Sequence, residues 1–472
     1  MPQFLISAAH KSSGKTTVSI GLCAAFKQRG LDVQSFKKGP DYIDPMWLSL
    51  ASGRPCRNLD FYLMANDEIR AMFDRYAADA DVGLIEGNKG LYDGLDLEGS
   101  NSNSALARLL DVPVVLVIDA RGMTRGIAPL ILGYQAFDRE INIAGVILNQ
   151  LGGARHESKL RAVIEHYTDV PVLGAVHHDT SLQIKERHLG LMPSNETEEA
   201  TRYVSEIGRV IAAQVNLDQL LTLGRPSEQH QHLVTEIQYE QGQINPVRIG
   251  LAKDKAFGFY YADDLDALKS AGAELVQLDT LNDPVLPDVD GLFIGGGFPE
   301  LMMNELEANA SLRRQIRDAI ESGMPVYAEC GGLMYLSRSL SWQGRTCEMV
   351  GAIPGDVVMH AKPVGRGYVR LQENGRSPWH RDTDKDEVEI PAHEFHYSSL
   401  ENLGEGIDFA YHMMRGHGVD GRHDGIMYKN LFASYSHLRS LKGYNWAERY
   451  VDWVRQKSLR RKQNSQVFEH IV

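Results

Sequence analysis

The chain has 472 residues, which is too long for one ordinary domain and predicts two or three. Its composition, 43% hydrophobic and 24% charged residues, is typical of a globular protein with a large core and excludes a disordered chain. The formal net charge of −13 argues against nucleic acids and anionic membranes as partners. A negatively charged ligand therefore needs local basic groups, backbone N–H groups or a metal ion.

The four cysteines lie far apart in the sequence and form no Cys-x-x-Cys pair; they are Cys23, Cys56, Cys330 and Cys347. This spacing argues against a zinc site and a disulfide framework, and it favours a reducing compartment. The first residues lack the basic and apolar regions of a signal peptide. No apolar run approaches the roughly 20 residues that a membrane span needs. We therefore expect a cytoplasmic protein.

The first 194 residues alternate short apolar runs with helical patterns. A helix is expected over 16–30, and the apolar runs predict strands at 4–7, 32–36, 82–87, 112–120, 144–150 and 170–176. Continuous apolar runs of this length indicate parallel strands that are buried on both faces. Residues 1–194 are therefore predicted to form a doubly wound α/β domain.

The rest of the chain divides into three parts. Residues 195–245 predict a helix and then a polar linker, in which His230 and His232 are better explained as solvated residues than as metal ligands. A second alternation predicts another doubly wound α/β domain over 246–440, and residues 441–472 predict a helical tail. The expected elements of this domain are strands at 247–252, 273–278, 291–297 and 324–330 and helices at 263–271 and 304–322.

A phosphate-loop pattern follows the first predicted strand. The stretch AHKSSGKTT, residues 9–17, fits G-x-x-x-x-G-K-[ST], except that Ala9 replaces the first glycine. In this motif the backbone N–H groups face the phosphates, Lys15 reaches the β- and γ-phosphates, and the Thr16 hydroxyl ligates Mg²⁺. A glycine-containing helix cap is the alternative, but the position between a strand and a helix favours a nucleotide site.

Four carboxylates occupy loops that follow predicted strands, namely Asp41, Asp44, Glu86 and Asp93. The carboxyl ends of strands are where doubly wound folds bind ligands. Carboxylates beside a phosphate loop usually hold Mg²⁺, because hard oxygen ligands bridge it to phosphates. Each acid alone is better explained as a solvated or capping residue, but together with Lys15 they favour an ATP–Mg²⁺ site.

One cysteine, Cys330, lies between an apolar run and a Gly-Gly helix start in VYAECGGLMYL, residues 326–336. A free cysteine is usually an inert core residue, but a helix N-terminus lowers the pKa of a thiol and favours a nucleophile. The upstream run LFIGGG is suited to supply N–H donors to an oxyanion. The base should be a histidine, and spacing alone does not choose among His393, His396 and His437.

Taken together, these motifs resemble those of the cobyrinic acid a,c-diamide synthase family, glutamine amidotransferases that amidate acetate side chains of a corrin. The resemblance covers almost the whole chain and rests on the phosphate loop and on KKGPDYIDP, NLD, EGNKGLYDG, PVVLVIDA, GVILNQ, ERHLGL, GGGFPEL, ECGGLMYL, HEFHYS and ASYSHLR. It implies an N-terminal domain similar to dethiobiotin synthetase and a C-terminal class I-type glutaminase. It further implies ATP, Mg²⁺, glutamine and a tetrapyrrole carboxylic acid as ligands, with a homodimer as one assembly to test.

By this resemblance, Cys330 is the nucleophile and His437 its base. The glutaminase pattern His-x-Glu is absent, since Leu438 and Arg439 follow the histidine, so that a Cys–His pair is expected. The resemblance assigns the other site residues as oxyanion donors (Gly296, Gly297, Gly331), nucleotide-binding residues (Ser12, Ser13, Gly14, Lys15, Thr16, Thr17, Asn149), metal ligands (Thr16, Asp41, Glu86) and substrate-binding residues (Tyr42, Asp44, Asn88, Lys89, Asp93).

Two departures from the family pattern bear on the substrate. The loop before Lys15 lacks the usual Ser-Gly-Val form, and the loop after Glu86 carries Asn88 and Lys89 where the family has Val-Met. A cation in that loop suits an extra carboxylate on the macrocycle. These variants resemble the homologue associated with dissimilatory sulfite reductase, which amidates sirohaem. Sirohaem is therefore the alternative substrate for the same reaction.

Three other functions explain only part of the sequence. A partitioning-type ATPase switch explains the phosphate loop but not the cysteine and histidine motifs. An amidase of the cobyric acid synthase type typically has a degenerate phosphate loop, whereas the lysine and threonine are intact here. A metal-dependent hydrolase built on His393 and His396 is disfavoured, because residues three apart in a strand point to opposite faces.

Overall fold

The computed structural model of the chain describes residues 2–182, 184, 186–187, 190–196, 199–223, 246–381 and 388–469. These residues belong to two compact units, which divide the chain between residues 236 and 237. Most of the expected linker, with His230 and His232, lies outside the described residues, as do His188 and Leu189 of the ERHLGL motif.

A seven-stranded sheet forms the centre of the first unit, in the order β3-β2-β4-β1-β5-β6-β7. Its strands are β1 (Gln3–Ala8), β2 (Val33–Lys38), β3 (Arg57–Leu59), β4 (Val82–Glu86), β5 (Val114–Asp119), β6 (Ile143–Leu151) and β7 (Val172–His177). Neighbouring strands pair in parallel. The strand order reverses at β1, and open α/β sheets bind ligands at the carboxyl ends of the strands at such a switch point. The predicted doubly wound domain is confirmed.

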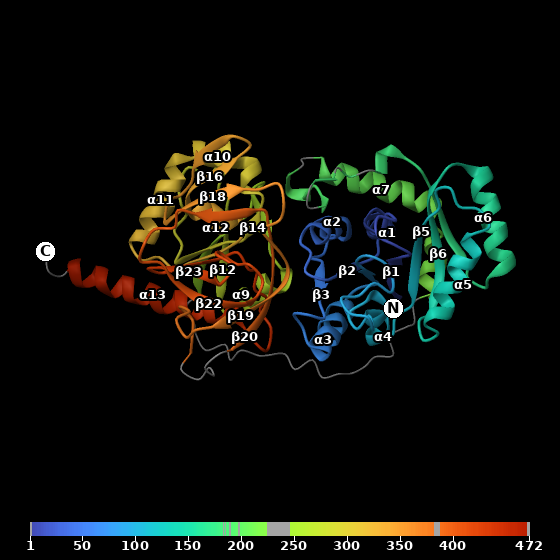
Figure 1. The fold of residues 1–472 in the computed structure, drawn as a ribbon, viewed down its shortest axis with the longest axis horizontal. Helices are drawn as coiled ribbons and strands as arrows, with labels where there is room; N and C mark the ends of the chain where they lie inside the picture. Colours follow the sequence, from blue (N-terminus) through green and yellow to red (C-terminus); the bar gives the residue numbers. More distant parts are fainter. Residues whose placement is uncertain are drawn as a thin grey trace. The chain divides into compact units, whose positions relative to one another are not determined.

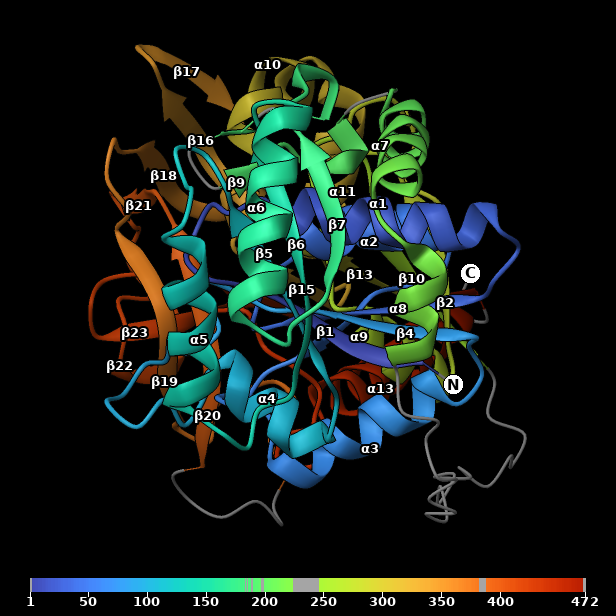
Figure 2. The same ribbon diagram turned by 90° about the vertical axis from the view of Figure 1, so that its right-hand side faces the viewer.

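Helices cover both faces of this sheet (Figures 1 and 2). On one face lie α1 (Lys15–Gln28), α2 (Ile43–Ser52) and α7 (Ala200–Gln214), and on the other lie α3 (Asn66–Ala77) and α4 (Asn103–Leu110). The unit also contains α5 (Ile127–Phe137), α6 (Ala154–Tyr167) and α8 (Leu217–Leu223). The single helix expected after residue 195 is divided into α7 and α8, because Val215 leaves the helical path and bridges to Gly174.

A nine-stranded sheet forms the centre of the second unit, in the order β12-β10-β13-β15-β24-β23-β22-β19-β20. Five strands pair in parallel: β12 (Ala273–Leu278), β10 (Val247–Ala252), β13 (Gly291–Ile294), β15 (Val326–Glu329) and β24 (Leu431–Ser434). The other four pair antiparallel: β23 (His423–Tyr428), β22 (Asp408–Arg415), β19 (Gly365–Glu373) and β20 (Glu389–His396). The parallel part was expected. The antiparallel part was not, because strands such as β19 mix buried and exposed positions and lack a continuous apolar run.

The helices of the second unit differ in two places from expectation. The helix expected over 304–322 is divided into α10 (Met303–Ala308) and α11 (Ala310–Glu321), because the Asn309 side chain accepts a hydrogen bond from Leu312 N and caps α11. The last helix, α13 (Trp446–Glu469), begins inside the core, where Trp446 packs against Tyr327. None of the described helices combines the length and the apolar character that a membrane crossing requires.

Candidate active sites

The phosphate loop connects β1 to α1. Gly14 adopts φ 85° and ψ 21° at the start of α1, a left-handed conformation that glycine takes without strain. A Cβ at this position would come within 2.1 Å of Asn149 Nδ2, which donates a hydrogen bond to the carbonyl of Ser13 at 2.9 Å. Asn149 thus holds the loop from the end of β6. Ser13 is itself buried, and its hydroxyl donates to the carbonyl of His10 at 2.8 Å.

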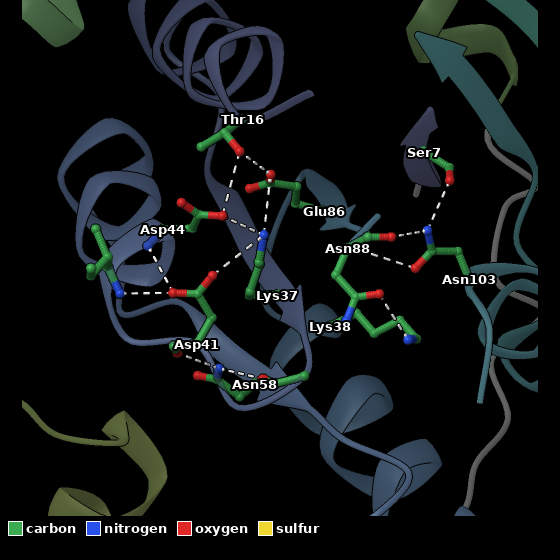
Figure 3. Close-up of polar contacts among 12 residues, drawn as sticks. Ser7, Thr16, Lys37, Lys38, Asp41, Asp44, Asn58, Glu86, Asn88 and Asn103 are labelled. Atoms are coloured by element: carbon green, nitrogen blue, oxygen red, sulfur yellow. Dashed lines mark hydrogen bonds and ion pairs between the residues drawn. The ribbon is translucent and has the colours of Figure 1, made fainter. Parts of the chain in front are cut away.

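A buried cluster of charged groups lies beside this loop (Figure 3). The Thr16 hydroxyl donates to Glu86 Oε1 at 2.6 Å and lies 3.4 Å from Asp44 Oδ2. The same two carboxylates contact the Lys37 ammonium, at 2.5 Å for Asp44 and 3.2 Å for Glu86. Burial lowers the pKa of Lys37, but the negative charges of Asp44, Glu86 and Asp41 outweigh this effect and raise it overall. The sequence analysis missed Lys37, although it begins the motif KKGPDYIDP.

The two aspartates of the KKGPDYIDP motif make different hydrogen bonds. Asp41 Oδ1 accepts hydrogen bonds from the N–H groups of Ile43 at 2.9 Å and Asp44 at 3.2 Å, so this side chain caps the first turn of α2. Asp41 was predicted as a metal ligand and Asp44 as a substrate residue. The capping bonds occupy one Asp41 oxygen, whereas Asp44 is the carboxylate within reach of Thr16.

These residues fit a magnesium ion that is shared with phosphates. Glu86 is fully buried, and its Oε2 has no hydrogen-bond partner among the described residues. Burial is also the main reason why the pKa of Glu86 is raised and that of Lys15 is lowered. No cluster of three or more His, Cys, Asp or Glu side chains suited to hold a metal occurs in the described parts of the chain. Mg²⁺ commonly binds through one or two carboxylates together with phosphates and water, which matches Thr16, Glu86 and Asp44.

The predicted substrate loop follows β4 directly. Asn88 is half-buried and accepts a hydrogen bond from Lys38 Nζ at 3.0 Å. Lys89 is exposed and adopts φ 44°. Asp93 accepts a hydrogen bond from Gly90 N at 2.8 Å, and its charge acts on Lys15. The structure thus brings this loop next to the charged cluster.

Two further residues of the predicted site lie at helix starts. Tyr42 is buried at the start of α2. Thr17 lies in the first turn of α1.

Ser12, another predicted nucleotide-binding residue, lies in the phosphate loop itself. It adopts a left-handed φ of 65°, which is uncommon for a residue other than glycine.

In the second unit, Cys330 forms a tight turn between β15 and α12 (Gly331–Leu336). It adopts φ 45° and ψ −98°, a conformation that residues other than glycine rarely take. A Cβ on Gly332 would come within 2.1 Å of the carbonyl oxygen of Ile294, so the helix start packs directly against β13. A strained strand–turn–helix of this kind presents a nucleophile at the end of a sheet.

The predicted oxyanion donors lie around this turn. The nitrogen of Gly297 is 3.0 Å from the position that a Gly331 Cβ would take, so these two residues approach closely beside Cys330. A Cβ on Gly296 would come within 2.7 Å of His437 Cε1, so the backbone of Gly296 lies against the imidazole.

A buried carboxylate contacts the imidazole of His437. Glu329 Oε2 lies 3.3 Å from His437 Nδ1, and both side chains are 4% exposed. The other oxygen, Oε1, accepts hydrogen bonds from the hydroxyl of Tyr327 at 2.5 Å and from Leu438 N at 3.0 Å. The His-x-Glu pattern is absent, but Glu329, the residue before the cysteine, supplies a carboxylate at Nδ1. The sequence analysis missed Glu329, because it lies 108 positions from His437 and no sequence pattern connects the two residues. Its position directly before Cys330 in the ECGG motif is the one feature of the sequence that points to it.

The other two histidines have packing roles. His393 stacks on His437 with ring centroids 4.9 Å apart and an interplanar angle of 15°. Burial, followed by the charges of His437 and Arg439, lowers the pKa of His393 far below its usual value, so it stays neutral. His396 stacks on Tyr435 and hydrogen-bonds through Nδ1 to the carbonyl of Ser398 at 2.8 Å.

The expected lowering of the Cys330 pKa is wrong for this structure. Burial, followed by the charges of Glu300 and Glu329, raises the pKa of the thiol well above its usual value, and the N–H of Gly331 only partly opposes this. The helix that follows is six residues long, so its dipole is weak. Cys330 therefore rests as a thiol, and a nucleophilic role requires a base that takes its proton.

Known proteins match both units and the chain as a whole. Residues 5–191 match the CobQ/CobB/MinD/ParA nucleotide binding domain, and residues 248–444 match the CobB/CobQ-like glutamine amidotransferase domain. The chain is 47% identical to the cobyrinate a,c-diamide synthase of Magnetococcus marinus, over 95% of this chain and 96% of that protein. It is 42% identical to the protein of the same name from Methanosarcina acetivorans, over 93% of each chain, and 40% identical to that of Archaeoglobus fulgidus, over 96% and 97%.

A nucleotide-binding domain joined to a glutaminase domain defines a glutamine-dependent amidating ligase. The full-length matches are more specific than this class. The chain belongs to the cobyrinate a,c-diamide synthase family, which confirms the resemblance and the predicted pair of α/β domains.

Proposed function

We propose that this enzyme converts the a and c acetate carboxylates of cobyrinate to amides, with glutamine as the nitrogen donor and ATP as the activating co-substrate. One observation carries the proposal. A single chain combines an intact phosphate loop, with Thr16 bonded to Glu86, and a strained cysteine turn in the same unit as a buried histidine–glutamate pair. The names of the relatives supply the substrate.

In the glutaminase domain, His437 takes the proton of the Cys330 thiol, and the thiolate attacks the amide carbon of glutamine. The N–H groups around Gly297 and Gly331 stabilise the resulting oxyanion. His437 then gives its proton to the departing ammonia, and water releases glutamate from the thioester. Glu329 holds Nδ1 of the imidazole, which leaves Nε2 to exchange the proton.

In the synthetase domain, the carboxylate of the substrate attacks the γ-phosphate of ATP and forms an acyl phosphate, because a carboxylate is itself a poor electrophile. Lys15 and the loop N–H groups hold the phosphates. Ammonia then attacks the acyl carbon, phosphate leaves, and an amide forms.

Thr16, Glu86 and Asp44 would hold Mg²⁺, which neutralises phosphate oxygens when it is bound there. Lys37 contacts both carboxylates and favours their ionised forms before the nucleotide arrives. All four cysteines are free thiols, which supports a reducing compartment such as the cytoplasm for a reaction that needs Cys330 reduced.

Sirohaem is the second candidate substrate, favoured by Asn88 and Lys89 beside the charged cluster. The test offers cobyrinic acid and sirohaem separately to the enzyme with glutamine, ATP and Mg²⁺, and reads each product by mass spectrometry. The small mass decrease that accompanies replacement of hydroxyl by amino identifies the substrate. No change with either tetrapyrrole contradicts the proposed function.

A further inference from the structure

One buried ammonium group in the first unit has no part in the scheme above. Lys38 ends β2, next to Lys37, and is 5% exposed. Lys37 contacts three carboxylates, whereas the hydrogen bond of the Lys38 ammonium goes to the neutral amide oxygen of Asn88 at 3.0 Å (Figure 3). Burying a cation is costly unless an anion compensates it, so a lysine in this setting calls for an explanation.

A buried asparagine, Asn103, fixes the loop whose Asn88 accepts the hydrogen bond of Lys38. Asn103 is fully buried; its Oδ1 accepts a hydrogen bond from Asn88 N at 3.1 Å, and its Nδ2 donates to the carbonyls of Asn88 at 2.6 Å and Gly90 at 2.9 Å. Nδ2 also lies 3.0 Å from the Ser7 hydroxyl at the end of β1. The loop is therefore pre-organised, and Lys89 is held in its unusual φ of 44°.

Two other lysines act electrostatically on the Lys38 ammonium. The pKa of Lys38 is lowered to about 8, mainly by burial; the charge of Asp60 opposes this shift, and the charges of Lys37 and Lys89 contribute to it. Lys37 itself contacts three carboxylates, whereas the ammonium of Lys38 contacts an amide oxygen. Lys89 is thus a second cation close enough to act on the Lys38 ammonium, and Asp60 is the acid whose charge acts on it in the opposite sense.

We propose that Lys38, Asn88 and Lys89 form a carboxylate-binding subsite, which holds a carboxylate of the tetrapyrrole other than the one being activated. The inference rests on the proposed function, because it concerns the substrate of the same site. An arriving carboxylate satisfies the buried ammonium of Lys38, and Lys89 reaches it from the solvent side. Charge-assisted hydrogen bonds of this kind are the strong ones, so they select macrocycles that carry several free carboxylates.

The test measures both binding and turnover. Binding of cobyrinic acid and of sirohaem is titrated by absorbance without ATP or glutamine, for the wild type and for Lys38→Met, Lys89→Met and the double variant. Lys159→Met, an exposed lysine on α6, is the matched control. We expect the Kd of the double variant to rise on the order of tenfold or more, with a rise in KM and a much smaller change in kcat. The wild type should also prefer the free acid to its methyl ester, and the double variant should lose this preference.

The outcomes separate the inference from the function on which it rests. Folded variants that bind the free acid as tightly as the wild type overturn the subsite, even if the enzyme amidates its substrate. A wild type that amidates neither tetrapyrrole contradicts the proposed function. In that case, a loss of binding in the variants of Lys38 and Lys89, but not in Lys159→Met, still supports a carboxylate site. Thermal melts of each variant verify folding; Met fits a buried position that a lysine stem already fills.

Discussion

The two active sites lie at the carboxyl ends of parallel strands, but they are built in different ways. In the synthetase domain, Lys37 is surrounded by three carboxylates, so the site depends on a balance of charges. In the glutaminase domain, Cys330 occupies a strained turn and the proposed base, His437, contacts a buried acid, Glu329, so the site depends on backbone geometry. Substitutions should therefore act through charge in the first site and through position in the second.

The largest effect is expected at the nucleophile. Cys330→Ser should lower glutamine-dependent amidation by at least about a thousandfold, because the hydroxyl is a far weaker nucleophile. Amidation with added ammonium chloride should persist, since the synthetase chemistry does not use the thiol. Product formation with each nitrogen source is the measurement. Cys347→Ser, which alters another buried thiol of the same unit, is the control, and equal loss with both nitrogen sources would count against separate sites.

The next effect concerns stability in the first unit. Lys37→Met should lower the free energy of unfolding at neutral pH by about 3–5 kcal/mol, because it leaves Asp44 and Glu86 buried without their cation. The pKa of Glu86 is already raised by burial, so the loss should shrink as the pH falls and the carboxylates become protonated. Denaturant unfolding at pH 5 and pH 8 measures this, with Lys159→Met as the control. A loss that is the same at both pH values would refute the charge-balance account.

A smaller loss is expected where a substitution disturbs the orientation of the proposed base. Glu329→Gln keeps the size of the side chain and an oxygen for Leu438 N, but it removes the negative charge at His437 Nδ1. We expect kcat for glutamine hydrolysis to fall roughly 10–100-fold, with little change in KM, because general acid–base steps depend on the orientation of the imidazole. Glutamate release is the measurement, and Glu274→Gln on the exposed side of β12 is the control. A change in KM alone would assign Glu329 to substrate binding.

The smallest effect is a pH dependence of tetrapyrrole binding. Burial lowers the pKa of Lys38 to about 8, so its ammonium loses the proton near that pH, while the carboxylates of the ligand stay ionised. The Kd should therefore rise a few-fold between about pH 7 and pH 9, and Lys38→Met should flatten this dependence. The titration is run at constant ionic strength, because salt screens the same attraction. An equal slope in wild type and variant would remove Lys38 from the subsite.

Local sequence patterns predicted the parallel strands and the two turns of the candidate sites. Contacts between residues that are far apart in the sequence could not be predicted in this way. The apolar runs located the parallel strands of both units, and the motifs around Gly14 and Cys330 located the two turns. The partnership of Glu329 with His437 joins residues that are 108 positions apart, which no single-sequence period reveals. The spacing also does not contain the hydrogen bonds by which Asp41, and not Asp44, caps the first turn of α2.

One measurement tests the central claim most directly. The enzyme is incubated with Mg-ATP, a tetrapyrrole carboxylic acid and glutamine labelled with nitrogen-15 at its side-chain amide, and the macrocycle is analysed by mass spectrometry. The account predicts that wild-type enzyme places the label in new amide groups of the tetrapyrrole, and that Cys330→Ser does so only when labelled ammonium replaces glutamine. ATP and glutamine hydrolysis without label in the tetrapyrrole would contradict it.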